Sequence, residues 1–461
     1  MLTPDLSVIK QHLIDPEICI RCNTCEATCP VGAITHDDRN YVVDADKCEL
    51  CMACIAPCPT GSIDNWRTLP RIKAYGVDEQ LGWDALPAEL DAEPSGSTDA
   101  TADEVVAVPP AAVPVAATAR GNAKFSSADC NATLPPWSAA HAYTHLYGPQ
   151  ASQKSISATV TGNVRVTAVG REYDTHHIVL DFGAVPLPLL EGQSIGILPR
   201  GVDAKGRPHR PRQYSIASPR NGERPGYNNA SLTVKRVLED HQGRPVRGVA
   251  SNFLCDLNVG DSVQVIGPFG ASFLMPNHPR SHIVMICTGT GSAPMRAMTE
   301  WRRRLWRAAA GPTQGGAAPR ATKGPLRAPG GGAGEAAAWG QGSSKFRSGK
   351  LLLFFGARTQ EELPYFGPLQ NLPKKFIDIN FALSRTPGAP KRYVQDLMRE
   401  RGADLAPLLA DPDAYFYVCG LKAMEEGVVQ ALRDVAHDAG LVWTEVAAVL
   451  KAQGRLHLET Y

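Results

Sequence analysis

The chain has 461 residues, enough for about three domains of ordinary size. It is 43% hydrophobic and 20% charged, as is typical of a soluble protein. Its longest apolar stretch, residues 105–119, contains Pro109, Pro110 and Pro114, which excludes it as a membrane span. The first 13 residues lack the basic start and apolar run of a signal peptide. We therefore expect a cytoplasmic protein with neither membrane nor nucleic acid as a partner.

Charge is distributed unevenly along the chain. Residues 1–70 carry five Lys/Arg against ten Asp/Glu, a net −5, and residues 71–125 carry four against nine, again −5. Residues 126–461 carry 38 against 27, a net +11. Opposite charges on two parts of one chain indicate electrostatic docking between them. The alternative is that both charges only aid solubility.

One cysteine pattern occurs twice near the N-terminus. Both copies read C-x2-C-x2-C-x3-C-P, with Pro30 and Pro59 in the last position. This spacing is typical of bacterial proteins with two 4Fe-4S clusters, in which the fourth cysteine of each copy ligates the other cluster. The pattern therefore predicts one cluster on Cys19, Cys22, Cys25 and Cys58, and a second on Cys48, Cys51, Cys54 and Cys29.

A zinc ribbon and a disulfide framework are the two alternatives to this iron-sulfur module. A zinc ribbon usually pairs two separate C-x2-C units, and a disulfide framework does not need the trailing prolines. The other four cysteines, Cys130, Cys255, Cys287 and Cys419, show no disulfide-like spacing. Iron-sulfur ligation and unpaired thiols both favour a reducing compartment.

The next segments predict a linker and an antiparallel domain. Residues 88–124 are rich in Ala, Pro, Ser and acidic side chains, as linkers are. Short runs of β-forming residues follow from about 155, which favours an antiparallel barrel.

Two segments of this domain suit a bound cofactor. Residues 212–218, Arg-Gln-Tyr-Ser-Ile-Ala-Ser, place an arginine, an aromatic ring and hydroxyls on one strand, which suits a planar cofactor that carries phosphates. Residues 247–253 open a short helix, whose N–H groups could hold phosphate.

The last segment predicts a dinucleotide-binding domain. The apolar strand at residues 282–287 leads into Thr-Gly-Thr-Gly-Ser-Ala-Pro at 288–294 and then into an amphipathic helix. Further strands at residues 351–356, 376–383 and 415–419 indicate an open parallel sheet. A Gly/Ala/Pro-rich insertion interrupts the domain, and residues 302–350 carry ten Lys/Arg and only one acid.

The predicted fold class is thus multidomain α+β and α/β, with a two-cluster ferredoxin module, an antiparallel β-barrel and an open parallel sheet. The expected boundaries are 1–75 for the cluster module, 76–150 for the linker, 151–278 for the barrel and 279–461 for the dinucleotide domain, with the insertion at 308–349.

Residues from about 155 onward resemble the plant-type ferredoxin–NADP reductase family, over about two thirds of the chain. Seven stretches carry the resemblance in the family's order: 212–218, 248–257, 288–294, 384–385, 391–395, 417–424 and 459–461. The resemblance implies an FAD-binding barrel followed by an NADP-binding domain. Two departures are Ala250, where plant members often have cysteine, and the insertion, which is foreign to the family.

The resemblance also assigns roles to individual residues. It implies catalytic roles beside the flavin and nicotinamide for Ser215, Cys419, Glu459 and the terminal Tyr461, whose ring would cover the flavin. It implies FAD or nucleotide contacts for Arg212, Tyr214, Ser215, Val249, Ala250, Ser251, Thr290, Gly420 and Tyr461. It implies a pocket for the adenosine 2′-phosphate at Ser384, Arg385, Lys391 and Tyr393. Without the resemblance, Cys419 would be read as a packing thiol and Ser384 as a strand-end residue.

These features together predict an NADPH-dependent oxidoreductase. NADPH delivers two electrons as a hydride and iron-sulfur clusters take one each, so a flavin belongs between them. The fusion resembles the reductase components of aromatic oxygenases and epoxidases, which implies a separate oxygenase component as the electron acceptor. The alternatives are a reductase for a different oxygenase or a soluble ferredoxin, and a redox sensor that binds flavin without turnover.

Overall fold

The computed structural model describes residues 7–55, 58, 60–87, 142–240, 242–309 and 348–461. Pro59, Cys130, most of the predicted linker and most of the predicted insertion lie outside these residues. In the described parts no helix is both long enough and apolar enough to cross a membrane.

The cysteine-rich module is built from two short antiparallel pairs. β1 (Val8–Leu13) pairs with β4 (Asn65–Pro70), and β2 (Ile34–His36) pairs with β3 (Tyr41–Val43). A helical turn, α1 (Thr24–Thr28), lies inside the first cysteine copy. The backbone repeats with the sequence: the Cys19 N–H donates to the Asp15 carbonyl at 3.1 Å, and the Cys48 N–H donates to the Asp44 carbonyl at 3.0 Å.

The module extends beyond its predicted end at residue 75. The short helices η1 (Arg71–Lys73) and α2 (Val77–Leu81) follow β4, and the Gln80 side chain donates to the Val43 carbonyl at 2.9 Å. Arg67 reaches the Pro87 carbonyl at 2.6 Å. At the other end of the predicted linker, Tyr147 is buried in the core of the next domain. Residues 76–87 and 142–150 therefore pack with the flanking domains, because side chains within them complete those two cores.

The second domain is a six-stranded antiparallel sheet. Its strands are β5 (Ile156–Arg165), β6 (Thr175–Asp181), β7 (Ser194–Leu198), β8 (Arg212–Ser215), β9 (Asn229–Lys235) and β10 (Ser262–Phe269), in the order β8-β7-β10-β5-β6-β9. One isolated bridge, Ile216 to Leu232, connects the β8 and β9 ends of the sheet. The expected barrel is not confirmed by this pairing alone. The helix α3 (Val249–Cys255) lies between β9 and β10 and begins two residues after the start of the predicted segment at residue 247.

The third domain is a five-stranded parallel sheet in the order β13-β12-β11-β14-β15. The strands are β11 (His282–Thr288), β12 (Leu351–Ala357), β13 (Asp378–Leu383), β14 (Ala414–Gly420) and β15 (Leu456–Thr460). The first four match the predicted strands. The fifth strand was not predicted, because it has only five residues and most of them are only partly buried.

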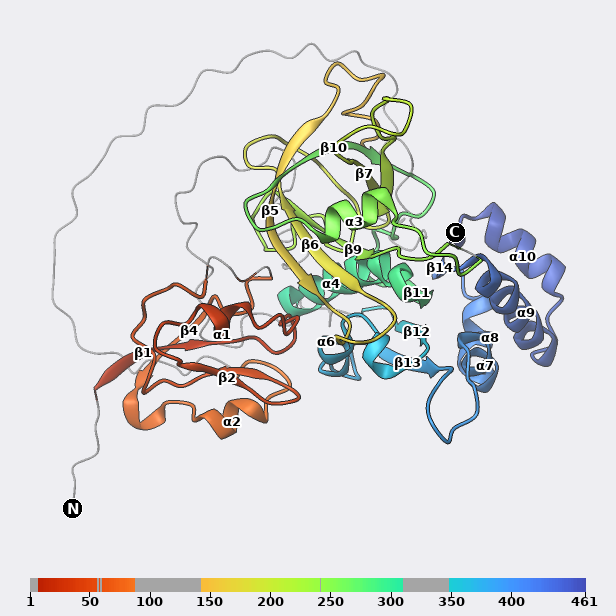
Figure 1. Cartoon of the computed structure of the whole chain (residues 1–461). Coiled ribbons are helices and arrows are strands. Elements are labelled where there is room, and N and C mark those ends of the chain that lie inside the picture. Colours follow the sequence, from red (N-terminus) through yellow and green to blue (C-terminus); the bar gives the residue numbers. More distant parts are fainter. Residues whose placement is uncertain (1–6, 56–57, 59, 88–141, 241, 310–347) are drawn as a thin grey trace, which may run out of the picture.

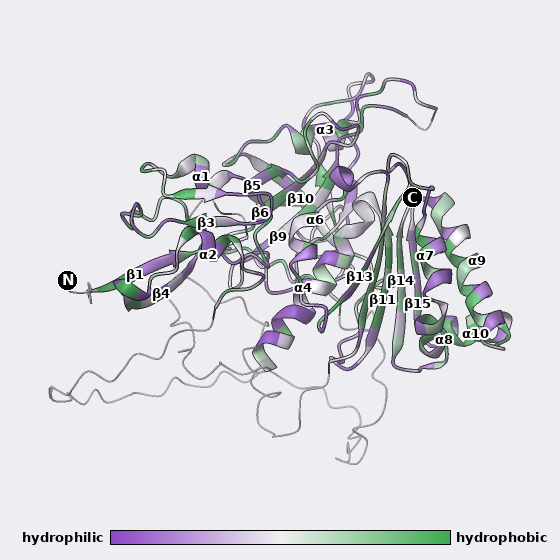
Figure 2. Ribbon diagram, turned by 90° about the horizontal axis from the view of Figure 1, so that it is seen from below, coloured by the Kyte–Doolittle hydropathy of each residue, from purple (hydrophilic) through white to green (hydrophobic). Residues whose placement is uncertain are grey.

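Helices cover both faces of this sheet (Figure 2). One apolar core packs the sheet against α7 (Val394–Glu400), α8 (Gly402–Ala410), α9 (Lys422–Asp438) and α10 (Trp443–Ala452). A second core packs the other face against α4 (Ser292–Ala309) and α6 (Phe366–Gln370), with η3 (Gln360–Glu362) just before α6. The 3-10 turn η2 (Gly289–Gly291) joins β11 directly to α4.

The cysteine module rests against α4 and α6 (Figure 1). Arg307 near the end of α4 pairs with Asp15 at 3.0 Å and with Glu17, and Arg224 pairs with Asp64 at 2.7 Å. Asn371 after α6 donates to the Pro16 carbonyl at 3.3 Å. Acidic side chains of the module thus contact basic side chains of the other two domains. The sign of these contacts agrees with the uneven charge along the sequence. The contacts of Arg307 come from α4 itself, just before the insertion.

Candidate redox centres and nicotinamide site

The first group of thiols combines three cysteines of one copy with the last cysteine of the other. Burial, with smaller contributions from the neighbouring thiols of Cys58 and Cys22, raises the pKa of Cys19 to about 12. Burial likewise raises the pKa of Cys25, with additional contributions from Cys19, Cys58 and Cys22. Hydroxyl groups surround this group: Thr24 donates to the Cys22 sulfur at 3.2 Å, and the Ser62 hydroxyl lies 3.3 Å from the Cys58 sulfur.

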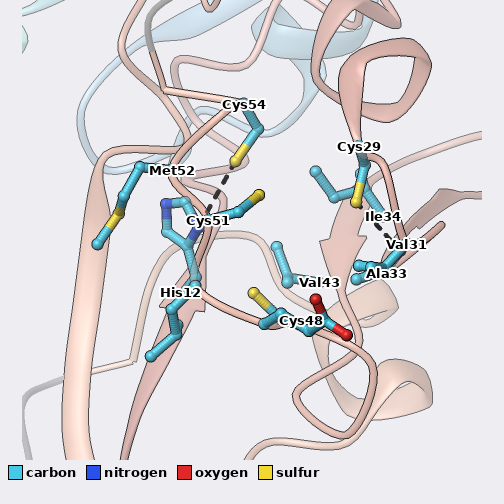
Figure 3. Close-up of a pocket in the computed structure, with 12 residues that line it drawn as sticks. His12, Cys29, Val31, Ala33, Ile34, Val43, Cys48, Cys51, Met52 and Cys54 are labelled. Atoms are coloured by element: carbon cyan, nitrogen blue, oxygen red, sulfur yellow. Dashed lines mark hydrogen bonds between the residues drawn. The ribbon is translucent and has the colours of Figure 1, made fainter.

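The second group has the reciprocal composition (Figure 3). Cys29 lies with Cys48, Cys51 and Cys54 around one pocket, whose other walls include Val31, Ala33, Ile34 and Val43. The Ala33 N–H donates to the Cys29 sulfur at 3.2 Å. Burial, with smaller contributions from the thiols of Cys48, Cys51 and Cys29, raises the pKa of Cys54 to about 11. The structure therefore brings together the two quartets that the spacing predicts, although they remain predicted ligands.

The thiol groups fit iron-sulfur clusters better than the alternatives. Apolar walls with N–H and O–H donors aimed at sulfur are the surroundings that tune such clusters. All eight cysteines are free thiols in the structure, so the disulfide alternative gains no support.

His12 is a neighbour of the second quartet that the sequence did not indicate. Its Nδ1 lies 3.7 Å from the Cys54 sulfur, and its ring stacks on Trp66 with the centroids 3.9 Å apart. Burial lowers the pKa of His12 to about 4, so the ring is neutral at physiological pH. No spacing rule could have found it, because β1 brings it to the site from outside the cysteine pattern.

The glycine loop after β11 fits tightly against the end of β14. A Cβ atom at Gly291 would come within 2.1 Å of the Cys419 carbonyl oxygen, so only glycine allows this approach. Gly420 has φ of +152°, and a Cβ there would come within 2.5 Å of the Thr288 hydroxyl. This close packing of the two strand ends forms the predicted nucleotide corner.

Three of the predicted catalytic residues gather at this corner. Cys419 and Glu459 are register neighbours on β14 and β15. The Tyr461 hydroxyl lies 2.5 Å from the Thr290 hydroxyl, and the Tyr461 N–H donates to the Gly420 carbonyl at 3.0 Å. Burial raises the pKa of Glu459 to about 7, which makes it a proton-exchanging group near neutral pH. Ser215, the fourth, belongs to the antiparallel sheet, where it pairs with Ser194.

The residues predicted to bind FAD lie on β8 and at the start of α3. Arg212 is exposed, and burial raises the pKa of Tyr214 to about 12. Val249 is exposed and Ala250 is buried. The Ser251 hydroxyl accepts the Val237 N–H at 3.1 Å and donates to the Gly248 carbonyl at 3.3 Å, so it also holds the helix start in place.

The predicted 2′-phosphate residues share one loop between β13 and α7. The Ser384 hydroxyl donates to the Ala357 carbonyl at 3.4 Å, and Tyr393 caps α7 reciprocally with Asp396. Arg385 and Lys391 are exposed in the same loop. The loop therefore presents two cations and two hydroxyls at one edge of the sheet.

A carboxylate that the sequence did not indicate faces this loop. Glu172, from the antiparallel domain, lies 3.7 Å from the Arg385 guanidinium and forms an ion pair with Arg358. Arg358 lowers the pKa of Glu172, so the carboxylate is ionised at neutral pH. Glu172 and Arg358 escaped the sequence analysis because each lies far along the chain from the loop.

Comparison with known proteins gives matches to both halves of the chain. Residues 285–430 match the family described as "Oxidoreductase NAD-binding domain", and residues 18–62 match the "4Fe-4S dicluster domain". The cyanelle ferredoxin–NADP reductase of Cyanophora paradoxa is 34% identical over 306 residues, which cover 65% of this chain and 74% of that protein. The ferredoxin–NADP reductase of Thermosynechococcus vestitus is 32% identical over 312 residues, 66% and 72% of the two chains.

Among solved structures, the ferredoxin-NADP+ reductase from Plasmodium falciparum with 2'P-AMP covers 69% of this chain and 99% of its own, with 20% identity and a TM-score of 0.47. The sequence relatives define the class: this is an NAD(P)-dependent oxidoreductase with a flavin-binding reductase part. The chain belongs to the ferredoxin–NADP reductase family, and it carries a 4Fe-4S ferredoxin domain in front of the reductase.

Proposed function

We propose that the protein oxidises NADPH and delivers the electrons singly, through FAD and two 4Fe-4S clusters, to a separate acceptor protein. One NADPH and two oxidised acceptors give NADP+, one proton and two reduced acceptors, so the electrons balance. A bound flavin supplies the step between hydride and single-electron chemistry.

The crossed cysteine quartets carry this proposal. Each group contains one cysteine from the other copy, which is the ligand pattern of two-cluster ferredoxins. A reductase that only exchanged electrons with a free ferredoxin would not need such a module in the same chain.

The loop between β13 and α7 and the nicotinamide corner both support NADPH as the donor. Arg385 and Lys391 provide two positive charges, a set suited to a phosphate and not to a bare ribose. Tyr461, held by Thr290 and Gly420, would cover the flavin until nicotinamide displaces it. Glu459 and Cys419 would then flank the nicotinamide ring.

For the acceptor we propose an oxygenase component, and for the protein the reductase component of benzoyl-CoA 2,3-epoxidase in aerobic aromatic degradation. The support is the fusion of a two-cluster module to a plant-type reductase. Reconstitution with purified epoxidase component and benzoyl-CoA tests this assignment: NADPH oxidation should couple to loss of benzoyl-CoA. Coupling to a different oxygenase, or to free ferredoxin only, would replace that partner and leave the reductase activity intact.

Cofactor analysis tests the electron route. Anaerobically purified protein should contain about eight iron and eight acid-labile sulfide per chain, with one FAD. Stopped-flow mixing with NADPH should reduce the flavin first and the clusters afterwards. Zinc, or about four iron in intact protein, would contradict two clusters. Flavin reduction without onward transfer to any acceptor would favour a redox sensor.

The crossed ligation has its own test. Cys29→Ser should damage the cluster of the second quartet and spare the first, although Cys29 belongs to the first copy of the pattern. Cys58→Ser is the matched variant and should damage the first cluster. Electron paramagnetic resonance (EPR) spectra of both reduced variants distinguish the two signals.

A further inference from the structure

The two cysteine loops of the module are equivalent in backbone but face different surroundings. Arg21 and Asn23 in the first loop have φ of 57° and 61°, and their equivalents Leu50 and Met52 in the second have φ of 56° and 63°. The repeat offset is 29 residues throughout, so the loops share one conformation.

The first loop is covered by the reductase. A Cβ atom at Gly367 in α6 would lie 2.9 Å from the Arg21 side chain, which shows how closely the loop packs there. Ile18 and Ile20 line a pocket together with Arg296 and Tyr365 of the reductase. The thiols of the first quartet therefore lie on the side of the module that faces the reductase.

The second loop is open to solvent. Leu50 and Met52 are 38% and 43% exposed, and Cys51 and Glu49 are exposed beside them. Bulky apolar side chains are uncommon at positive φ, where Asn, Asp or Gly is favoured. These two residues flank the predicted ligand Cys51, where both line the pocket of the second quartet and leave part of each side chain exposed to solvent.

The loop itself carries a single negative charge, and Lys47 just before it is paired with Asp44 at 3.0 Å. Residues 48–58 contain one acid, Glu49, and no lysine or arginine. The module as a whole is acidic, with ten Asp/Glu and five Lys/Arg in residues 1–70. Three of those acids, Asp15, Glu17 and Asp64, are paired with arginines of the reductase and are not available to a second partner.

We infer that the loop of residues 49–52 is the docking surface for the external electron acceptor, and that this acceptor presents an apolar contact patch with a basic rim. The inference rests on the proposed function. Electrons enter the module at the covered first quartet and leave at the exposed second one, where an acceptor's redox group can approach Cys51 closely. Leu50 and Met52 supply the apolar contact, and Glu49 attracts the basic rim.

Cytochrome c is a suitable probe, because basic side chains surround its exposed haem edge. The test variant is Leu50→Asn with Met52→Asn, since Asn occupies the equivalent position 23 and tolerates positive φ. The matched control is Val169→Asn, an 87% exposed apolar residue on the antiparallel domain. Calorimetry with redox-inactive zinc cytochrome c measures binding, and NADPH-driven reduction of iron cytochrome c gives KM.

The double variant should weaken binding and raise KM on the order of fivefold to tenfold, since tenfold corresponds to about 1.4 kcal/mol. Iron content should stay unchanged, and the rate of cluster reduction by NADPH, measured without the probe, separates a change at the cluster from a change in docking. Val169→Asn should match the parent in every measurement. Equal binding and KM in the parent and the double variant would overturn the inference.

Cross-linking of the unmodified protein gives a second test that does not depend on a variant. A carbodiimide joins cytochrome c lysines to carboxylates in direct contact. Links to Glu49 support the inference, and links confined to the reductase domains overturn it. If NADPH fails to reduce the clusters of the unmodified protein, the proposed function fails, while calorimetry and cross-linking still decide where the probe binds.

Discussion

Glu17 of the cysteine module and Arg303 of α4 are both almost fully buried, with side chains 2% and 4% exposed, and their charged groups lie 3.7 Å apart. Arg307 of the same helix also pairs with Glu17. A carboxylate from one domain is thus enclosed by two arginines of another. Buried charges of this kind are tolerated only when paired, so the pair favours one docked position of the module.

Replacement of this carboxylate should loosen the docked module. Glu17→Gln removes a charged partner from the buried Arg303, at a cost of about 1–3 kcal/mol. We expect cluster reduction to slow severalfold in stopped-flow experiments, while flavin reduction by NADPH keeps its rate. Asp38→Asn, which removes an exposed carboxylate of the same module, is the control and should have no effect. A cluster-reduction rate that is equal in all three proteins would show that this pair does not position the module.

Removal of the basic insertion should have little effect on docking. Among the residues that the structure describes, the arginines that contact the module are Arg224, Arg303 and Arg307, and all three lie outside residues 310–347. Replacing residues 310–347 with a short Gly-Ser linker should therefore leave both reduction rates within about twofold of the parent, even at low salt, where exposed charges act over about 30 Å. Slower cluster reduction in this variant at low salt alone would assign the insertion a docking role.

Glu459 should make NADPH oxidation depend on pH near neutrality. Burial raises the pKa of this carboxyl from 4.5 to about 7. Above that pH the carboxylate stabilises the positive charge that develops on nicotinamide, so flavin reduction should accelerate as the pH rises through about 7. Glu459→Gln should remove this rise and keep the rate of the low-pH form. A rise that persists in the variant would assign it to another group.

The same shift has a consequence for stability. The folded protein holds the Glu459 proton more tightly than the unfolded chain, so this group favours folding below about pH 4.5 and that contribution is lost as the pH rises to about 7. Glu459→Gln should flatten the pH dependence of the free energy of unfolding between these values. Denaturant titrations of the parent and the variant at pH 5 and pH 7.5 measure this free energy.

Coenzyme choice should depend on the loop between β13 and α7. Arg385→Ala should raise the KM for NADPH by about tenfold or more, because a hydrogen bond to a charged group contributes roughly 1.5–3 kcal/mol. The KM for NADH should change little. Glu172→Gln is the converse variant: it removes a carboxylate 3.7 Å from Arg385, so the KM for NADPH should fall. Equal use of both coenzymes by the parent would contradict the assignment of the pocket.

The terminal residue should control discrimination between the coenzymes. Tyr461→Ser removes the ring and should narrow the preference for NADPH over NADH, because nicotinamide would no longer have to displace an aromatic ring. Tyr461→Phe keeps the ring and loses only the contact with the Thr290 hydroxyl at 2.5 Å, so it should retain most of the preference. If both variants lost the preference for NADPH to the same extent, the discrimination would depend on the Tyr461 hydroxyl and not on its ring. Steady-state kinetics with both coenzymes measures it.

Much of this protein could be predicted from local sequence patterns. The cysteine spacing predicted which thiols meet, because a C-x2-C-x2-C loop is too short to place its members elsewhere. The glycine corner and four strands of the parallel sheet were predicted from apolar runs and from the turn residues beside them. The positions of β15 and of the module's end were missed, since both depend on packing against residues distant in the chain.

Tertiary structure alone decided the relations between domains. His12 beside Cys54, Glu172 beside Arg385 and Glu17 between Arg303 and Arg307 each join residues from separate elements. The sequence indicated that an acidic module would meet a basic body, because net charge is a sum over residues. It could not indicate which loop would face the reductase. The two loops share a pattern, and only the packing of α4 and α6 distinguishes the covered one from the exposed one.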